Sequence, residues 1–311
     1  MRHQILFSVL ALLPACAHME KERGHDSVDE LVRARIGQHT GWEHGSPEAR
    51  QISGRVHELL QGGLTRERAV QIALLNNPRL QETYDELDVS QADLVQAGLL
   101  SNPSLGGSIG FRMNGSGRPE YEVSIVQSFL DIFMPPLRKR VARAEFDAEI
   151  LRVAHAALET GAMASKEFTE VQAKTQTVQL MRGIAAGADA AATLAGAQFD
   201  AGNVSERMLA SERAMSVQAQ LDLGHDELEL TEYREKLNRL LGLWGTDLSW
   251  KLGQQLPAIP AHEEPLDHLE ARALTQRLDV QAARKQVEMM DNALSVARTS
   301  RYTGVVNVGA H

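Results

Sequence analysis

Histidine is the residue type in this chain best suited to metal chemistry, and it is concentrated near the N-terminus, at His18, His25, His39, His44 and His57. A metal site on a helix needs two ligands one turn apart, at positions i and i+4, and a zinc site needs a cluster of closely spaced ligands. No pair of these histidines has either spacing. We therefore expect no metal site and interpret the histidines as solvated surface side chains.

Catalytic motifs are missing as well. The sequence contains no phosphate-binding loop, no HExxH motif and no set of cysteines spaced for zinc. Methionines at Met208, Met215, Met289 and Met290 could bind a soft metal, but methionine at helical spacing usually fills a core. We predict no catalytic residue, no metal ligand and no cofactor, and we expect that the chain is not an enzyme.

The only cysteine, Cys16, is placed for acylation. The chain opens with MRH and the apolar run ILFSVLALL, which has the charge order and length of a secretory signal and is too short to cross a bilayer. The next letters, LPAC, resemble the bacterial lipobox, in which cleavage leaves a lipid-modified cysteine at the N-terminus. We predict a signal peptide at residues 1–15 and lipidation of Cys16, with Ala17 favouring the outer membrane. An ordinary signal peptide is the alternative.

Composition and charge narrow the class of protein. The net charge is −9 and no basic stripe occurs, which argues against a nucleic-acid partner. Aromatic residues make up only 5% of the chain, which favours long helices packed through small side chains.

The chain contains an internal repeat. The stretch from Leu64 to Phe111 recurs between Leu266 and His311. Both copies place apolar residues seven positions apart, at Leu80, Leu87 and Leu94 and at Val280, Val287 and Leu294. Each copy then changes from a helical to an extended pattern. The repeated unit is therefore a helix followed by a strand.

The first copy begins with a helix expected over residues 65–100. Thr65 is its candidate N-cap. Pro78 should kink or break this helix near Asn76 and Asn77, because proline has no amide hydrogen and crowds the preceding turn.

A β-hairpin is expected over residues 104–129. In its second strand the apolar residues Tyr121, Val123 and Ile125 alternate with polar ones, so one face is apolar and the other polar. A wall between lipid and water shows this pattern, although a half-buried soluble hairpin would alternate in the same way.

A long helix is expected over residues 137–199, because no proline occurs between Pro136 and Pro257. Apolar residues recur at a spacing of seven, at Ile150, Ala157, Ala164, Val171, Val178, Ala185, Ala192 and Phe199. This period is typical of a supercoiled helix, on the order of 90 Å long at 1.5 Å per residue.

A turn over residues 200–204 should end this helix, with Gly202 in the left-handed conformation. Ser205 should then cap a return helix over residues 205–241. We divide the mature chain into an N-terminal arm at 16–63, interpreted as extended with short helical pieces, a first repeat at 64–256, a linker at 257–265 and the start of a second repeat at 266–311.

Several of these segments together resemble the TolC-type outer-membrane efflux proteins. The matching pieces are ALLNNPRLQ, ADLVQAGLLSNPSL, LRKRVARAEFDAE, QFDAGNVSERMLASERA and KLNRLLGL. The sequence of the first helix looks most like that of the heavy-metal branch, whose members serve cobalt–zinc–cadmium or copper efflux pumps of the RND type. This sequence is VQIALLNNPRLQETYDELDVSQADLVQAGLL.

The resemblance implies a mainly α fold with a small β part. Long antiparallel coiled-coil helices form an α-barrel in the periplasm, and the hairpin contributes to the outer-membrane β-barrel of a homotrimer. Tyr121, Val123 and Ile125 would then form the outer, lipid-facing side of the hairpin. The turn at Ala201, Gly202 and Asn203 matches the family tip that docks on a periplasmic adaptor, a membrane fusion protein. A plain helix–helix turn is equally compatible with these residues.

The function implied by the resemblance is a passive exit duct in a Gram-negative outer membrane, lipid-anchored and extending into the periplasm. An inner-membrane RND pump would supply energy, and the exported species would be heavy-metal cations. Alternatives are a channel for drug efflux or type I secretion, a non-functional truncated fragment, and a lipid-anchored periplasmic coiled-coil scaffold. Because the second repeat stops within its first strand, we expect the sequence to be C-terminally truncated.

Overall fold

The structure is a computed structural model of the chain. It describes residues 23–42, 45–100, 102, 104–110, 120–128, 134–259, 261–262, 267–303 and 307–310. The expected signal peptide, Cys16, His18, His44 and the hairpin turn lie outside the described residues. The chain forms two compact units, one from Met1–Ser27, Asp85–Arg152 and Leu274–His311 and the other from Val28–Tyr84 and Val153–Ala273.

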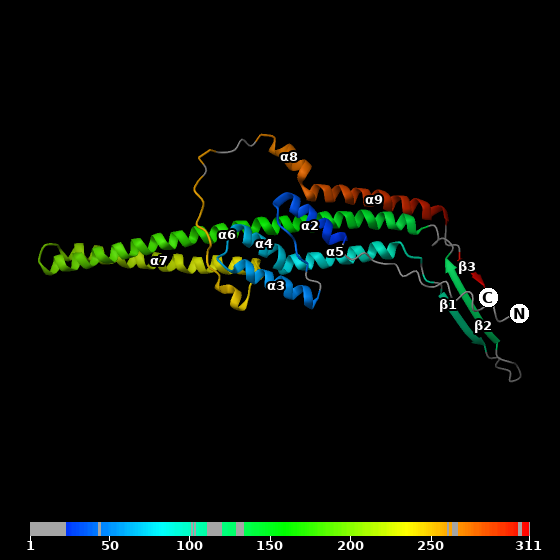
Figure 1. Ribbon diagram of the computed structural model, residues 1–311, viewed down its shortest axis with the longest axis horizontal. Helices are drawn as coiled ribbons and strands as arrows, with labels where there is room; N and C mark the ends of the chain where they lie inside the picture. Colours follow the sequence, from blue (N-terminus) through cyan, green and yellow to red (C-terminus); the bar gives the residue numbers. More distant parts are fainter. Residues whose placement is uncertain are drawn as a thin grey trace. The chain divides into compact units, whose positions relative to one another are not determined.

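The described residues form helices and a few strands (Figure 1). The helices are α2 (Arg23–Ile36), α3 (Ser46–Leu60), α4 (Arg66–Asn76), α5 (Pro78–Ala97), α6 (Pro135–Asp200), α7 (Glu206–Leu240), α8 (Leu269–Gln276) and α9 (Leu278–Thr303), with a 3₁₀ turn η3 (Gly245–Ser249). The strands are β1 (Ser104–Gly110), β2 (Glu120–Ser128) and β3 (Asn307–Ala310).

The expected break at Pro78 is present. Helix α4 begins after Thr65, whose side chain accepts a hydrogen bond from the Arg68 amide at 3.3 Å, and it ends at Asn76. Helix α5 starts at Pro78. The second copy of the repeat breaks at the equivalent place, between α8 and α9, although Leu278 stands where the first copy has proline. The break is therefore a property of the repeat position and does not require proline.

The N-terminal arm contains two short helices. Helix α2 has 14 residues and α3 has 15. The glycines that suggested loops lie near the helix ends, where Gly37 and Gly45 have positive φ. Val28 and Val32, spaced four residues apart on one face of α2, are fully buried. Burial of this apolar stripe explains why the arm folds as helix.

The core of the second unit lies where α4 meets the middle of α6 and the end of α7. Phe168 and Leu237 are fully buried there, and Trp250 follows from the segment after η3. The ring of Trp250 is fixed from two sides, because its Nε1 donates to Asn238 Oδ1 at 2.8 Å and the Arg234 guanidinium lies 3.9 Å from its centroid. One large aromatic thus anchors the segment after α7 to the helices.

The strands form an antiparallel sheet in the order β1-β2-β3. In β1 and β2, Gly107 pairs with Val123 and Ser108 pairs with Glu122. The apolar side chains Ile109 and Val123 are 57% and 64% exposed, and the Ser108 hydroxyl donates to Glu122 on the opposite face at 3.1 Å. The expected alternation holds for these residues. Tyr121 and Ile125 lie in β2, but their side chains are outside the described set.

Helices α6, of 66 residues, and α7, of 35, form an antiparallel hairpin (Figure 1). The predicted apolar seam of α6 is buried at Ala157, Ala164, Val171, Val178 and Ala185. Nearer the turn the positions of this seven-residue series are no longer buried: Phe199 is 38% exposed, whereas Ala195, outside the series, is buried. The predicted fold class, mainly helical with long antiparallel helices and a small β part, is confirmed. No described helix has a stretch long and apolar enough to cross a membrane.

Candidate functional site

The turn between α6 and α7 has a defined backbone conformation. Gly202 has a φ of 76°, its amide donates to the Phe199 carbonyl at 2.8 Å, and the Asn203 amide donates to the Gln198 carbonyl at 2.8 Å. These two bonds form a Schellman motif, which satisfies the last carbonyls of α6. The predicted conformation of Gly202 is thus present. The residue faces open space, because a Cβ added to it would meet no atom within 4 Å.

The return helix begins as predicted. The Ser205 hydroxyl accepts a hydrogen bond from the Met208 amide at 3.3 Å. Ala201, Gly202 and Asn203 are all exposed. The turn therefore presents a short, rigid and accessible surface at the end of the hairpin.

Two basic residues of α6, Lys174 and Arg182, form ion pairs with α7. Lys174 Nζ lies 2.7 Å from Asp226 Oδ1 and also contacts Glu229, and these hydrogen bonds raise the pKa of Lys174. Arg182 pairs with Glu227 at 2.7 Å. The Lys174 and Asp226 side chains are only 17% and 11% exposed, whereas Arg182 and Glu227 are 61% and 44% exposed. The first pair is therefore the one that solvent screens least.

The other end of α7 is held by two asparagines from the break between α4 and α5. The side-chain amide of Asn76 donates to the carbonyls of Leu241 and Gly242 at 2.9 Å each, and that of Asn77 donates to Leu240 at 2.7 Å. These are carbonyls that the helix itself leaves unpaired. In the sequence these asparagines stand out only as neighbours of Pro78, because their partners lie far away along the chain.

Both helices of the hairpin carry large apolar side chains that the described part of the chain leaves exposed. On α7 these are Met208, Met215, Val217, Leu221 and Leu228, which are 53% to 63% exposed. On α6 they are Leu180, Ile184 and Leu194, at 65%, 48% and 59%. They lie outside the α6–α7 seam. Exposed apolar rows on this scale are typical of surfaces that contact another protein or a membrane.

Three of the N-terminal histidines bond to carboxylates. His25 Nε2 lies 2.8 Å from Asp88 with the histidine side chain only 13% exposed, while His39 pairs with Asp29 at 3.1 Å and His57 with Asp247 at 3.2 Å. Sequence spacing gave no sign of these partners. In the part of the chain that the structure describes, no group of three or more His, Cys, Asp or Glu residues is arranged to hold a metal ion.

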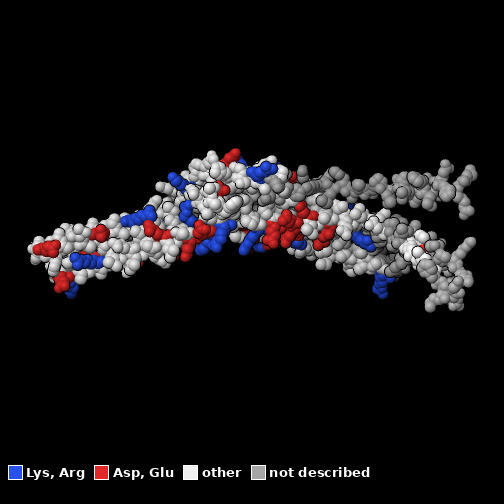
Figure 2. Space-filling model, turned by 90° about the horizontal axis from the view of Figure 1, so that it is seen from below, with Lys and Arg blue, Asp and Glu red and all other residues white. Residues whose placement is uncertain are grey.

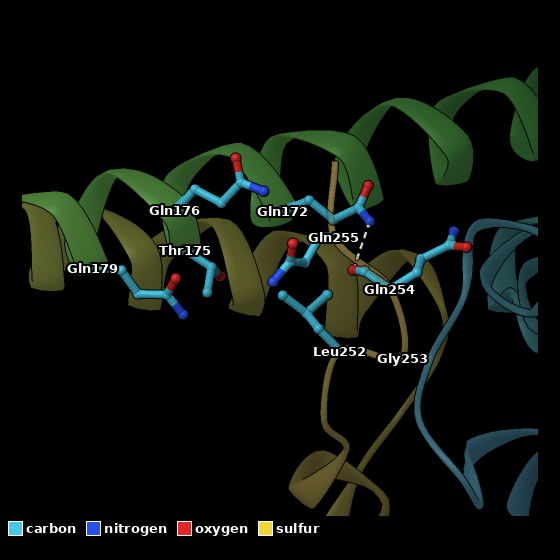
Figure 3. Close-up of a pocket in the computed structure, with 8 residues that line it drawn as sticks. All are labelled: Gln172, Thr175, Gln176, Gln179, Leu252, Gly253, Gln254 and Gln255. Atoms are coloured by element: carbon cyan, nitrogen blue, oxygen red, sulfur yellow. Dashed lines mark hydrogen bonds between the residues drawn. The ribbon is translucent and has the colours of Figure 1, made fainter. Parts of the chain in front are cut away.

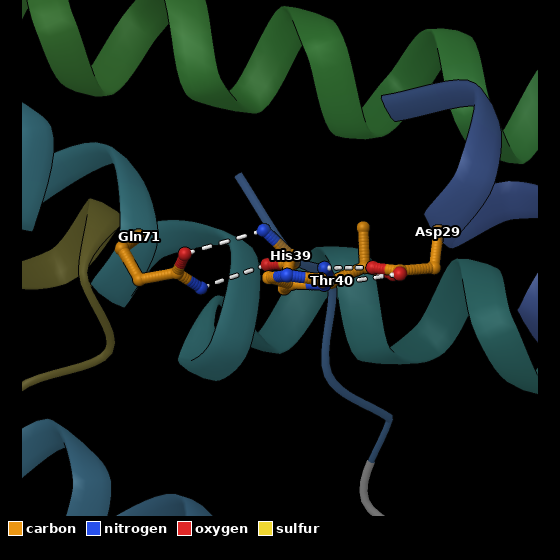
Figure 4. Close-up of polar contacts among 4 residues, drawn as sticks. All are labelled: Asp29, His39, Thr40 and Gln71. Atoms are coloured by element: carbon orange, nitrogen blue, oxygen red, sulfur yellow. Dashed lines mark hydrogen bonds and ion pairs between the residues drawn. The ribbon is translucent and has the colours of Figure 1, made fainter. Parts of the chain in front are cut away.

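His39 belongs to a polar cluster that fixes the segment after α2 (Figure 4). The Gln71 side chain bonds to both backbone groups of His39, accepting from its amide at 3.2 Å and donating to its carbonyl at 2.7 Å. Asp29 accepts hydrogen bonds from the amide and hydroxyl of Thr40, at 2.7 and 3.2 Å. These contacts hold the backbone of the segment against α2 and α4.

The charges of the described residues are mixed. On the face drawn in Figure 2, acidic and basic side chains both occur along the helices, and the basic ones form no continuous stripe. This surface agrees with the net charge of −9. It offers no extended path for a phosphate backbone.

Comparisons with known proteins identify the family. The model of the outer membrane efflux protein family matches residues 69–243, more than half of the chain. Three solved structures share the fold at 16% identity: a membrane protein from Pseudomonas aeruginosa (TM-score 0.60, covering 76% of this chain and 58% of that one), CusC (0.63, 82% and 58%) and the Campylobacter jejuni outer membrane channel CmeC (0.63, 88% and 59%).

The chain thus spans less than two thirds of the length of each of these structures. A comparison with curated proteins gives no significant match. The family model covers the residues that form the helix break, the β-hairpin and the α6–α7 hairpin. The chain belongs to the outer membrane efflux protein family.

Proposed function

We propose that the complete protein is the outer-membrane exit duct of a tripartite RND-type efflux system. It works passively, without a catalytic residue or cofactor. The observation that carries this proposal is the α6–α7 hairpin, which has one buried seam of its own and further rows of exposed apolar side chains on both helices. A family member built in this way reaches full burial only when neighbouring hairpins cover those rows.

In a homotrimer, the neighbouring copies would cover the exposed apolar rows of α6 and α7. Closing hairpins around an axis pairs each exposed row with a neighbouring copy and leaves the mixed charged faces toward water. The low aromatic content, 5%, suits this arrangement, because small side chains let helices approach closely.

The β-hairpin supplies part of the membrane wall in this proposal. Its apolar face, with Val123 and Ile109 exposed, would contact outer-membrane lipid together with Tyr121 and Ile125. The opposite face, where Ser108 bonds to Glu122, would line the aqueous lumen. Closure of the strands into a barrel removes the unpaired edges that lipid cannot satisfy. An acylated Cys16 adds a second attachment to the membrane.

The partners follow from the same reasoning. The exposed turn at Ala201, Gly202 and Asn203 would dock on a periplasmic adaptor, which connects the duct to an inner-membrane RND pump. Support comes from the rigidity of the turn, whose two backbone hydrogen bonds fix its shape before any partner binds.

Heavy-metal cations are the proposed cargo, because the sequence of the first helix resembles that of the heavy-metal branch of the family. A wide aqueous duct does not itself select metals, so the pump sets the specificity. Export of drugs or of a type I secretion substrate uses the same duct geometry and is the alternative for the cargo.

Membrane fractionation of the complete protein in a Gram-negative host tests the duct. We expect recovery in the outer membrane, cross-linking to a trimer and incorporation of a labelled fatty acid that is lost in Cys16→Ala. Recovery in the soluble periplasm as a monomer would instead indicate a scaffold and exclude the duct. Resistance assays then separate the two kinds of cargo when the adaptor and pump are also expressed. Protection against toxic cadmium, copper or zinc salts would indicate metal export, and protection against toxic dyes would indicate drug export.

A further inference from the structure

A pocket of about 410 Å³ lies in the first unit, between the start of α6 and α9. Its lining consists of Pro136, Lys139, Arg140, Arg143 and Ala144 from α6, and of Glu288 and Asn292 from α9. One turn away on each helix, Lys285 of α9 pairs with Asp147 of α6 at 3.5 Å and so joins the two walls. The volume falls in the range of about 300–1,000 Å³ that is usual for ligand sites.

Three cations of α6 line this pocket, which we call the basic pocket. Lys139 and Arg143 are one turn apart, and Arg140 lies between them. All three are exposed, and none forms an ion pair with a residue that the structure describes. Glu288 is the acidic residue of the lining, and Lys285 Nζ already neutralises it at 2.9 Å. The basic pocket therefore carries positive charge that the described residues do not compensate.

The position of these cations works against the stability of α6. From Pro135 to Ala144 the helix has four basic residues and no acidic one. The N-terminal end of a helix carries a partial positive charge, so cations in its first turns are unfavourable. Like charges one turn apart, as at Lys139 and Arg143, also repel each other. Helix formation thus does not explain these cations, whereas an anion bound between them would relieve both costs.

The hydrogen-bond donors of the lining favour a phosphate group. A guanidinium forms paired hydrogen bonds with two phosphate oxygens, and a lysine ammonium adds a compact charge. The side-chain amide of Asn292, which has no hydrogen-bond partner in the described part of the chain, adds a neutral donor from α9. The backbone at the helix start does not form this site, because the amides of Leu137 and Arg138 already donate to the Met134 carbonyl.

A pocket in the second unit has a different chemistry (Figure 3). It measures about 370 Å³ and has an uncharged lining of glutamines with Thr175, Leu252 and Gly253. The Gln172 side chain there donates to the Gln254 carbonyl at 2.9 Å and fixes the segment after η3 to α6. A charged group would find no counter-charge in this lining, so of the two pockets only the basic one suits an anion.

We propose that the basic pocket binds a phosphate group, with Arg140 and Arg143 on the phosphate oxygens and Lys139 as a further counter-charge. The phosphate belongs to the headgroup of an anionic lipid or to a small phosphorylated solute. Only six residues, 129–134, separate β2 from α6, a distance of at most roughly 25 Å. This short connection favours the lipid if β2 lies in the membrane wall. The choice of the lipid source therefore rests on the proposed function, whereas phosphate binding itself does not.

Titration calorimetry of the complete protein in a non-ionic detergent tests the basic pocket, with heats corrected by titration into detergent alone. The ligands are water-soluble: dihexanoyl phosphatidylglycerol, glycerol 3-phosphate and, as an anion without phosphorus, acetate. We expect saturable binding of both phosphate ligands and none of acetate. Lys139→Gln/Arg143→Gln should weaken phosphate binding at least tenfold, because two charge-assisted contacts are lost. Lys166→Gln/Arg213→Gln removes the same charge from exposed positions outside the pocket and should leave it unchanged.

The relative affinities of the two phosphate ligands distinguish the two sources. Tighter binding of the lipid, with a larger loss in the pocket variant, assigns the site to a lipid headgroup. Equal or tighter binding of glycerol 3-phosphate assigns it to a solute. Because the ligands are soluble, this assay reads the pocket wherever the protein is recovered in the cell. A soluble periplasmic protein that still binds phosphate would contradict the duct and leave the pocket standing.

Other results overturn the proposal. Absence of saturable phosphate binding at millimolar concentration would show that the pocket is not a site. Acetate bound as tightly as phosphate, or equal losses in the two double variants, would show a general effect of charge. Thermal unfolding tests the argument from helix stability, because the pocket variant should have a Tm equal to or above that of the unmodified protein. A lower Tm would show that these cations stabilise the fold and need no ligand to explain them.

Discussion

The side-chain amide of Asn77 donates a hydrogen bond to the carbonyl oxygen of Leu240, 2.7 Å away, and so ties the break between α4 and α5 to the last turn of α7. The Oδ1 atom of the same side chain accepts from the Leu80 amide at 3.0 Å and caps α5. One side chain, 5% exposed, therefore begins one helix and ends another.

Replacement of Asn77 tests this link. Asn77→Ala removes the cap and the bond to Leu240, and we expect a loss of about 2 kcal/mol in the free energy of unfolding. Asn77→Ser keeps an oxygen that can cap α5 and should recover about half of that loss. Denaturant unfolding followed by circular dichroism measures both, with the exposed Asn203→Ala as control. Equal losses for Ala and Ser would assign the whole effect to the bond with Leu240.

Gly202 and Gly242 form a matched pair for measuring steric crowding. Both end a helix with positive φ, 76° and 64°, and the same two Schellman hydrogen bonds. A Cβ at Gly202 would meet nothing, whereas one at Gly242 would collide with the backbone oxygen of Asn76. We expect Gly202→Ala to cost about 1 kcal/mol in unfolding free energy and Gly242→Ala about 2–4 kcal/mol. Equal costs would show that the carbonyl of Asn76 moves away.

The two α6–α7 ion pairs should differ in strength. Double-mutant cycles with Lys174→Met and Asp226→Asn, and with Arg182→Met and Glu227→Gln, measure each coupling energy. The exposed Arg182–Glu227 pair should contribute about 0.2–1 kcal/mol. The shielded Lys174–Asp226 pair should show the larger coupling and the smaller dependence on salt. A coupling that vanishes at high salt for both pairs would contradict this ranking.

Glu149 should make stability depend on pH. Burial raises the pKa of this carboxyl, the neighbouring Arg152 opposes the shift, and Glu86 and Glu145 add to it. Because the folded pKa lies above the unfolded one, the ionised form is disfavoured in the fold. Its unfavourable contribution is present above the raised pKa and fades as pH falls toward the ordinary carboxyl range.

The measurement is the Tm of Glu149→Gln relative to the unmodified chain. We expect the variant to have the higher Tm near pH 7, and the difference to shrink as pH falls below about 4, where the carboxyl becomes protonated in both states. Glu159→Gln, at an exposed position on the same helix and not among the groups that shift the pKa of Glu149, serves as control. A variant with a lower Tm at pH 7 would show that the ion pair with Arg152 outweighs the cost of burial.

The exposed apolar rows predict assembly. Leu221→Gln/Leu228→Gln should reduce the trimer fraction in sedimentation velocity of the complete protein, because each side chain loses apolar surface that a neighbouring copy covers. Ile259→Gln, 93% exposed but away from the hairpin helices, should not. An unchanged trimer in the first variant would place the contact between copies elsewhere.

Local rules in the sequence predicted the parts of the fold that depend on neighbours along the chain. The conformation of Gly202, the caps at Thr65 and Ser205 and the break at Pro78 each follow from residues a few positions apart. The seam of α6 followed from its seven-residue period as far as Ala185. Beyond Ala185 the seven-residue spacing of apolar residues continues at Ala192 and Phe199. Whether these side chains are buried depends on the packing of α7 against this end of α6, which the spacing does not predict.

Contacts between distant segments could not be predicted in this way. The hydrogen bonds from Asn76 and Asn77 reach residues 163 to 166 positions away, and no spacing rule connects an asparagine to a carbonyl at that distance. The histidine–carboxylate pairs share this property.

The start of α6 carries a further consequence. Pro135 and Pro136 have no amide hydrogen, and the next two amides, of Leu137 and Arg138, both donate to the Met134 carbonyl at 3.0 Å. A helix normally needs water or a side chain to satisfy its first four donors, and this one needs neither. The first turn of this long helix is therefore complete with a single acceptor, the Met134 carbonyl, and can form where solvent is scarce.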